Sequence, residues 1–357
     1  ETVKDETTAA KSEETTVPEE TTTEETTTAE PTIEYVEPAA ADFEYNYDAA
    51  LKGAVITKYN GSAEAIRIPT ELDGDPVVQF SLGESGNRTV THVEIPDGIT
   101  SIGKGAFREC SNLKSVIIPD SVTEIGWYSF GKCGSLESIE IPNSVTVIGE
   151  TAFYSCSSLE SITIPDSVTE IEESAFSLCI NLKSIKLPNG ITRINYWTFY
   201  NCTSLESIEI PDGVTVICDG AFYECTSLKS VTIPNGVKAI GSIPYNSGKT
   251  FYGCTSLESI SIPDSVEFID HETFLNCSNL KEVTLPDGVI LGSNVFDNCT
   301  SFRSLTLPDN VSKNDYFGGF FNKCEALTVT YKGNEYNYTN FSDLYEAMPQ
   351  KNYTFTE

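Results

Sequence analysis

The chain has 357 residues, with 53 acidic and 22 basic side chains, so its net charge is −31. This excess of negative charge argues against a nucleic-acid partner and against docking on anionic lipid, because both surfaces carry the same sign. No run of 18 apolar residues occurs, so the sequence predicts no direct insertion of this chain into a membrane.

The first 42 residues differ in composition from the rest of the chain. Residues 1–40 contain 12 Thr, 11 Glu and one Asp against two Lys. Apolar side chains are too sparse to offset the entropy lost on ordering, and like charges keep such a segment extended. We therefore expect residues 1–42 to form a disordered acidic Thr/Glu-rich linker, typical of a tether at a cell surface. The alternative is an acidic tail without a role.

An internal repeat dominates residues 90–327. A Phe followed three residues later by a Cys recurs ten times, with a step of 23 residues through Cys225 and then of 29, 23, 22 and 25. The cysteines of this series are Cys110, Cys133, Cys156, Cys179, Cys202, Cys225, Cys254, Cys277, Cys299 and Cys324. Such self-similarity at a fixed period indicates a repeat architecture.

Each repeat predicts one short strand followed by a turn. The apolar residues alternate toward the end of Leu113, Val116 and Ile118, as in a strand with one buried face. Pro119 cannot donate a ladder hydrogen bond and ends the strand, and Asp120 then favours a turn. A single repeat cannot bury its own apolar face, so neighbouring repeats must stack into a solenoid.

The repeat unit resembles the leucine-rich repeat of the BspA-like bacterial surface proteins, whose period is also 23 residues. The resemblance covers about residues 50–327, and Ile66–Pro69 with Asp73–Val78 is similar to that family's longer first coil. It implies an α/β, mainly β, right-handed curved solenoid of about ten coils. It also implies a secreted or cell-surface protein that binds or adheres. Residues 81–89 and the six extra residues after Ile240 depart from the pattern.

Both ends are expected to carry caps that shield the terminal strands from pairing with other molecules. We expect an N-terminal cap and atypical first coil over residues 43–89, with a hairpin over Phe43–Tyr59. We expect a C-terminal cap over residues 328–357, with a hairpin turning at Lys332–Gly333 and a short helix over Ser342–Met348 capped by Ser342.

The eleven cysteines cannot all pair internally, because their number is odd. In the column of ten, Cβ atoms would lie about 4.8 Å apart with parallel side chains, whereas a disulfide needs about 3.8 Å. We therefore favour buried free thiols acting as small hydrophobes, with some disulfides as the alternative. A linear column lets at most two thiols approach one point, which argues against zinc. Cys218 lies off the column, where exposure is expected.

The sequence predicts neither a metal site nor a cofactor. The Asp or Asn after each Pro places neighbours one coil apart, whereas hard cations need six or more converging oxygens. Turn formation explains the same residues.

Catalytic signatures are missing from the sequence, which predicts no enzyme. The two histidines, His92 and His271, are expected at exposed positions with no nucleophile beside them. Gly248–Thr250 ends like a phosphate-binding loop, but Ile243 stands where the first glycine would be, so we interpret it as a surface loop. A general acid needs a carboxyl group in an apolar pocket, and a filled solenoid interior is expected to offer none.

Two surfaces are candidates for binding. The outward strand positions form a small polar face, suited to hydrogen bonding along an extended ligand or simply solvated. Aromatic residues that break the repeat are more informative, because exposed rings stack on sugars or anchor protein partners; the alternative is that they cover the coil edges. The candidate binding residues are Trp127, Tyr128, Tyr154, Tyr196, Trp197, Tyr200, Tyr223, Tyr245 and Tyr252.

The leading hypothesis is a non-catalytic cell-surface or secreted scaffold for binding or adhesion that recognises an extracellular protein or a glycan. The alternative is a structural or spacer protein of the cell envelope without a specific ligand. We expect an extracellular or cell-surface location, with any anchor upstream of Glu1.

Overall fold

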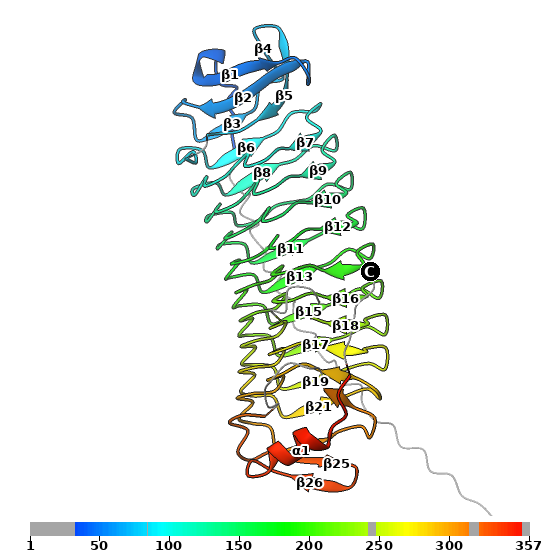
Figure 1. The fold of residues 1–357 in the computed structure, drawn as a ribbon. Helices are drawn as coiled ribbons and strands as arrows, with labels where there is room; N and C mark the ends of the chain where they lie inside the picture. Colours follow the sequence, from blue (N-terminus) through cyan, green and yellow to red (C-terminus); the bar gives the residue numbers. More distant parts are fainter. Residues whose placement is uncertain (1–32, 84, 242–247, 314–320, 352–357) are drawn as a thin grey trace, which may run out of the picture. The chain divides into compact units, whose positions relative to one another are not determined.

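The computed structural model describes residues 33–83, 85–241, 248–313 and 321–351. From Tyr35 onward the chain forms one compact unit. In this unit, coils of chain follow one another along a common axis and contribute short strands to two columns (Figure 1). The described residues are almost all in short strands and turns, which confirms the mainly β solenoid expected from the repeat.

The first column contains the strand predicted before each Pro. In β11 the central Ile162 is buried, whereas Ser161 and Thr163 on either side are exposed. Neighbouring strands pair in parallel and in register, so that Ile162 lies opposite Ile185. The column comprises β3 (Ala65–Arg67), β6 (His92–Glu94), β8 (Ser115–Ile117), β11 (Ser161–Thr163), β13 (Ser184–Lys186), β15 (Ser207–Glu209), β17 (Ser230–Thr232), β19 (Ser259–Ser261), β21 (Glu282–Thr284), β23 (Ser304–Thr306) and β25 (Thr328–Tyr331).

A second column of two-residue strands follows each turn, and the repeat pattern did not predict it. The turn itself is as expected, because the Val122 N–H donates to the Pro119 carbonyl at 3.1 Å. The chain then enters β9, whose Ile125 is buried. The column comprises β7 (Ser101–Ile102), β9 (Glu124–Ile125), β10 (Val147–Ile148), β12 (Glu170–Ile171), β14 (Arg193–Ile194), β16 (Val216–Ile217), β18 (Ala239–Ile240), β20 (Phe268–Ile269), β22 (Ile290–Leu291) and β24 (Ser312–Lys313).

The segment that carries Phe and Cys closes each coil without a regular strand. Its backbone still bonds to the next coil, since the Phe153 N–H donates to the Ala175 carbonyl at 2.8 Å and the Phe176 N–H to the Thr198 carbonyl at 3.0 Å. From Phe107 to Phe321 the ten repeat phenylalanines form one stack, with neighbouring ring centroids 5.0–5.9 Å apart and ring planes within 15° of each other. Such offset stacking adds to the burial of each ring.

All eleven cysteines are buried, and none of them forms a disulfide. In nine of them the thiol donates to the carbonyl of the Phe of the preceding coil at 3.1–3.2 Å, as Cys202 does to Phe176. That carbonyl already accepts the Cys179 N–H, so the thiol satisfies its second lone pair. The thiols are therefore hydrogen-bond donors as well as small apolar groups.

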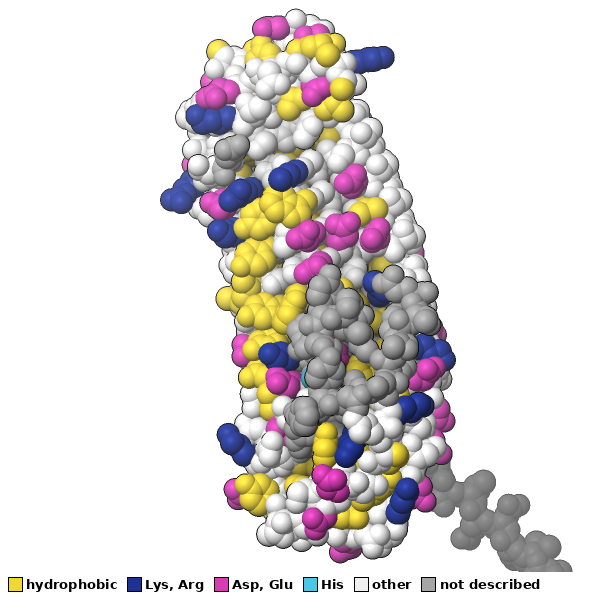
Figure 2. All heavy atoms as spheres, in the orientation of Figure 1, with side chains coloured by type: hydrophobic (Ala, Val, Ile, Leu, Met, Phe, Trp, Pro, Cys, Tyr) yellow, Lys and Arg dark blue, Asp and Glu magenta, His cyan; other side chains and the backbone are white. Residues whose placement is uncertain are grey.

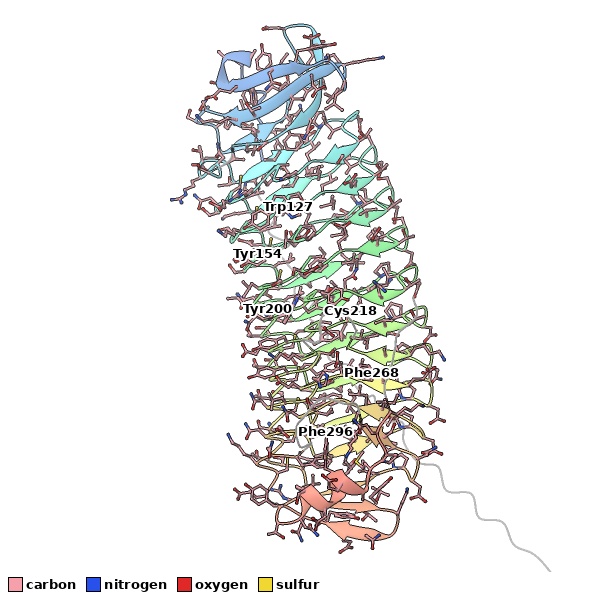
Figure 3. The ribbon with its side chains drawn as sticks, viewed as in Figure 1. Trp127, Tyr154, Tyr200, Cys218, Phe268 and Phe296 are labelled. Atoms are coloured by element: carbon pink, nitrogen blue, oxygen red, sulfur yellow. The ribbon has the colours of Figure 1, made fainter. Side chains whose placement is uncertain are left out.

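The expected exposure of Cys218 is wrong, because its side chain is only 1% exposed. Cys218 directly follows the buried strand β16, and its N–H donates to the Ile194 carbonyl of the preceding coil at 2.9 Å. This position is therefore covered by the stacked coils, among which Figure 3 labels it.

Because the cysteines are buried, their reactivity toward a thiol reagent tests whether they form the buried column. Desolvation raises the pKa of Cys110 to about 11 and that of Cys179 to about 12, so neither forms the reactive thiolate at neutral pH. We expect a thiol-specific chromophoric reagent to modify almost no cysteine in the native protein and all eleven after denaturation without reductant. Fewer than eleven reactive thiols after denaturation would reveal disulfides, and rapid native reaction would contradict the buried column.

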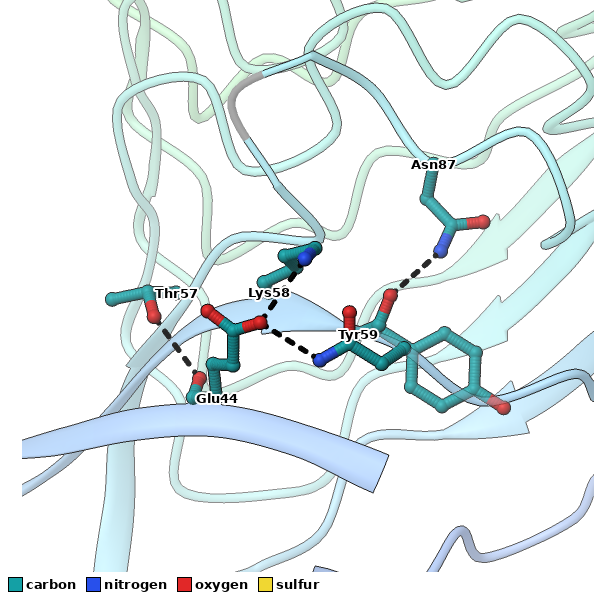
Figure 4. A network of polar contacts seen from close by, with 6 residues as sticks. Glu44, Thr57, Lys58, Tyr59 and Asn87 are labelled. Atoms are coloured by element: carbon teal, nitrogen blue, oxygen red, sulfur yellow. Dashed lines mark hydrogen bonds and ion pairs between the residues drawn. The ribbon is translucent and has the colours of Figure 1, made fainter. Parts of the chain in front are cut away.

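The N-terminal cap is a four-stranded sheet in the order β1-β2-β5-β4. β1 (Phe43–Asp48) and β2 (Gly53–Tyr59) form an antiparallel hairpin, and β2 pairs in parallel with β5 (Asp75–Phe80), next to β4 (Glu71–Leu72). Glu44 accepts hydrogen bonds from Lys58 at 3.0 Å and from Asn60 at 2.9 Å, and the Asn87 side chain ties the hairpin to the first coil by donating to the Tyr59 carbonyl at 3.1 Å (Figure 4).

The expected end of the acidic linker at residue 42 is too late. Val36 forms a parallel bridge with Ile66, its N–H donates to the Ala65 carbonyl at 3.0 Å, and η1 (Ala40–Asp42) leads into β1. Residues from Tyr35 onward therefore belong to the solenoid unit, and residues 1–32 lie outside the described residues.

The C-terminal cap contains the antiparallel pair β25 and β26 (Asn334–Tyr336), followed by α1 (Phe341–Ala347). The helix begins one residue earlier than expected, with Asn340 and not Ser342 at its N-cap. Leu344 of α1 is buried, so the helix packs one apolar side chain against the end of the solenoid. The C-terminal segment also bridges back to the second column, where Gln350 pairs with Lys313.

A glycine that follows the second strand tests how closely the coils pack. A Cβ atom on Gly149 would lie 2.9 Å from the backbone atoms C of Gly126 and N of Trp127. We expect Gly149→Ala to push two coils apart and to lower the free energy of unfolding by about 1–3 kcal/mol, measured by urea denaturation. The control is Gly134→Ala, whose new Cβ would meet only the Ser157 hydroxyl at 3.4 Å. Equal stabilities of the two variants would contradict this close packing.

Candidate functional site

The candidate aromatic residues occupy two places in the coil, on either side of the stacked Phe. Trp127–Tyr128 and Tyr196–Trp197 precede the Phe of their coils, and the other tyrosines directly follow it. Tyr245 lies outside the described residues. Tyr196 is half-buried, and its carbonyl accepts the Ser174 N–H at 2.9 Å.

Four of these residues form a continuous ring stack over three coils. Tyr200 and Tyr223 have ring centroids 5.1 Å apart, and Tyr223 and Tyr252 are 4.5 Å apart with planes at 3°. Trp197 contacts the stack from the side, 5.6 Å from Tyr200 and 5.8 Å from Tyr223. Burial, together with the neighbouring Tyr252, raises the pKa of Tyr223 to about 12, so this hydroxyl stays neutral at physiological pH.

A second aromatic group lies closer to the N-terminal cap. Trp127 and Tyr128 have ring centroids 5.5 Å apart, and Tyr128 lies 5.8 Å from Tyr154. Trp127 is 38% exposed, more than any other candidate residue that the structure describes. One coil separates the two groups, because the buried Ser177 replaces the tyrosine there.

The two groups together are called the aromatic strip. In the space-filling view hydrophobic side chains gather in a band down one side of the coils (Figure 2), and Trp127, Tyr154 and Tyr200 follow one another along that side (Figure 3). The aromatic strip consists of Trp127, Tyr128, Tyr154, Trp197, Tyr200, Tyr223 and Tyr252.

Two members of the strip have a backbone conformation that disfavours large side chains. Tyr128 has φ +53° and Trp197 has φ +57°, whereas Gly105 and Gly220 have φ +64° at the equivalent position of other coils. Gly220 also makes room for the indole, since a Cβ there would lie 2.1 Å from the Trp197 ring. Five further coils have φ between +54° and +66° at this position without glycine, so the conformation belongs to the repeat and does not single out the aromatic residues; they carry Thr151, Ser174, Lys249, Glu272 and Asn294.

The polar outward face of the first strand column lacks such anchors. The charge column beside it forms ion pairs between adjacent coils, with Lys183–Glu160 at 2.8 Å, Lys229–Glu206 at 2.7 Å and Lys281–Glu258 at 2.8 Å. Each of these side chains is more than half exposed, so each pair contributes little to stability. Their regular register fits coil alignment better than ligand recognition.

Comparison with known proteins agrees with this geometry. A family model described as the BspA type leucine rich repeat region matches in six copies, over residues 85–206, 147–248 and 246–347. The chain belongs to the BspA-type leucine-rich repeat family. No curated protein matches the chain.

Solved structures support the same fold for this BspA-type chain. A leucine-rich repeat protein from Bacteroides ovatus is 28% identical, with a TM-score of 0.56 over 82% of this chain and 88% of that one. The pneumococcal vaccine antigen PcpA is 22% identical, with a TM-score of 0.51 over 84% and 88% of the two chains. A leucine-rich cell surface protein from Faecalibacterium prausnitzii is 26% identical over 85% and 96% of the two chains, but its TM-score of 0.43 is too low to support the fold.

The expected exposure of His271 is wrong for this BspA-type solenoid, because the residue is only 8% exposed. Two carboxyl groups, those of Asp219 and Asp270, are fully buried in the interior. Asp270 stands where five of the ten coils carry glycine, directly after the second strand, and its Cβ lies over Gly241. Burial and the neighbouring Asp219 raise the pKa of Asp270 to about 7, against a bond from the His271 N–H that lowers it.

The group around His271 resembles part of a catalytic triad but differs from one in its hydrogen bonds. The Ser293 hydroxyl lies 2.7 Å from His271 Nδ1, which also accepts the Ser293 N–H at 2.8 Å. His271 Nε2 is 3.6 Å from Asp270 Oδ1, beyond hydrogen-bond distance. An Asp with a raised pKa is not the ionised group that orients a catalytic imidazole. His92 is half-buried and lies 2.8 Å from the Thr91 hydroxyl.

Neither a metal nor a membrane span is indicated by the described residues. Among them, no three His, Cys, Asp or Glu side chains are grouped so that they could hold a metal ion. In the same part of the chain, no helix has the length and apolar character that crossing a membrane requires.

The raised pKa of Asp270 predicts a specific pH dependence. The folded state holds the Asp270 proton more tightly than the unfolded state. This group therefore leaves the free energy of unfolding unchanged below about pH 4 and lowers it increasingly as the pH rises from about 4 to about 7. We expect Asp270→Asn to leave Tm unchanged near pH 4 and to raise it by about 5 °C at pH 8. The control is Asp264→Asn at an exposed turn, which should change Tm little at either pH. A lower Tm for Asp270→Asn at pH 8 would contradict the assignment.

Proposed function

We propose that this chain is a non-catalytic binding scaffold, displayed at a cell surface or secreted, that engages an extracellular macromolecule through the aromatic strip. The observation that carries the proposal is the strip itself, in which seven partly exposed rings are held in a fixed order by stacked coils. Aromatic anchors of this kind dominate the energetics of many interfaces.

Similarity to surface proteins supports the proposed location. The family model is that of the BspA type, and the solved structures of similar fold include a vaccine antigen of the pneumococcus. We infer an extracellular or cell-surface location for this chain, with an acidic linker before Tyr35 that holds the solenoid away from its anchor.

The proposed absence of catalysis is supported by the protonation and burial of the groups around His271. In the described part of the chain, the one Ser–His contact involves a His whose pKa is lowered by burial and a carboxyl group that is neutral below about pH 7. General acid–base chemistry needs such groups within reach of a substrate, and this cluster is almost fully buried.

Glycine variants separate a binding role from a packing role. In Tyr128→Gly and Trp197→Gly the relief of backbone strain should offset most of the lost ring contacts, so the free energy of unfolding should change by less than about 1 kcal/mol. We expect binding to immobilised extracellular matrix proteins and to a glycan array to fall at least about tenfold in both variants.

The control for these variants is Tyr338→Ala, an aromatic residue 52% exposed in the C-terminal cap, which should bind as the parent does. Equal binding by parent and glycine variants would favour the alternative of a structural spacer. Failure of the parent to bind any probe would have the same consequence.

A further inference from the structure

A groove lies between the N-terminal cap and the first coils, at the end of the aromatic strip. It has a volume of about 550 Å³, and its lining includes Thr57 of β2, Gln79 of β5, and Lys104, Arg108 and Trp127 of the coils. Concave sites of this size suit small ligands or single residues of a polymer. Its floor is apolar and includes the buried Ile56 and Phe80.

The cations that line this groove have few acidic partners within the chain. Lys104 is exposed and its Nζ lies 4.3 Å from the centroid of the Trp127 ring, whereas no carboxylate in the described part of the chain is within ion-pair distance of it. Such a contact holds the ammonium group at the mouth of the groove.

Arg108 contributes a second cation that is only partly engaged. Its Nη2 is 3.5 Å from Glu109, its guanidinium carbon is 5.4 Å from the centroid of the Tyr128 ring, and its Nε is buried without a hydrogen-bond acceptor. Glu109 is shared with Lys132, which lies 3.2 Å away. Figure 2 shows Lys and Arg side chains gathered around the end of the hydrophobic band nearest the cap.

We propose that this groove binds the acidic group of an anionic oligosaccharide, with its carboxylate or sulfate at Lys104 and Arg108 and its sugar ring against Trp127. The proposal deepens the proposed function, because the ligand would extend from the groove along Tyr128 and Tyr154 of the strip. The acidic group is the part of the ligand that the groove would hold.

The lining favours a sugar acid over an acidic peptide. Thr57, Gln79 and Ser81 place neutral hydroxyl and amide groups beside the cations, which match the hydroxyl groups of a sugar. The Gln79 side chain packs over Gly103, where a Cβ atom would lie 2.8 Å from its amide nitrogen, so the amide is held in place. A protein partner needs a much larger surface, about 800 Å² on each side, than this groove provides.

Calorimetric titration of the full chain with four probes tests the proposal. The probes are sialyllactose, which carries a carboxylate, a chondroitin sulfate tetrasaccharide, which adds sulfate, neutral lactose and hexaglutamate. We expect at least one acidic sugar to bind, neutral lactose to bind at least about tenfold more weakly, and the affinity to fall as salt rises from about 50 to 500 mM. Charge reversal in Lys104→Glu should weaken binding of the acidic sugar at least about tenfold.

The matched control is Lys114→Glu, which makes the same charge change at an exposed lysine that does not line the groove and should alter the affinity less than about twofold. Binding of lactose equal to that of the acidic sugars, equal affinities of the two lysine variants, or binding of hexaglutamate alone would overturn the proposal. So would the absence of binding by every acidic sugar. Retained attachment to matrix proteins or glycans under any of these outcomes would leave the proposed function standing.

Discussion

The structure depends on one constraint, which is that each coil finds its missing partners only in the coils next to it. The backbone around each repeat Phe bonds to the next coil, its ring stacks between neighbouring rings, and its carbonyl accepts a thiol from the coil that follows. An isolated coil would leave all three unsatisfied. Stacking is therefore the source of stability, and the repeat period is its consequence.

The same constraint explains how the surface carries function. The stacked phenylalanines fix the spacing of the coils. A side chain next to the Phe in the sequence therefore recurs at the same spacing on the outer surface of the solenoid. Tyr200, Tyr223 and Tyr252 stack at 4.5–5.1 Å for this reason. A rigid core can also tolerate local strain, such as the positive φ of Trp197, because neighbouring coils hold the backbone in place. The solenoid thus sets the spacing between the aromatic groups on its surface.

Sequence reasoning predicted the features that repeat and missed those that depend on distant partners. The period of Phe and Cys predicted the stacked coils, and the Pro turn gave the end of the first strand. The second strand column was missed because two residues such as Glu124–Ile125 show no alternation. The available signal was an Ile six residues after the Pro in eight of the ten repeats, from Ile102 to Ile269.

Other features could not be predicted because their partners lie far along the chain. The burial of Asp270 arises where a coil lacks the glycine that five of the ten coils carry, and the sequence does not show what covers it. The groove beside Trp127 unites Thr57 and Gln79 of the cap with Lys104 and Arg108 of the coils. No local pattern links those segments, so only the fold brings these groups together.

Native-state hydrogen exchange of the Phe153 and Phe176 amides tests the central claim most directly. These N–H groups lie in irregular segments, yet each donates to the next coil at 2.8 and 3.0 Å. If stacking is the source of stability, both amides should exchange only through unfolding of the central coils, with the same protection as the amides of β11 and β13. Exchange as rapid as in a surface turn, while the strands stay protected, would contradict the account.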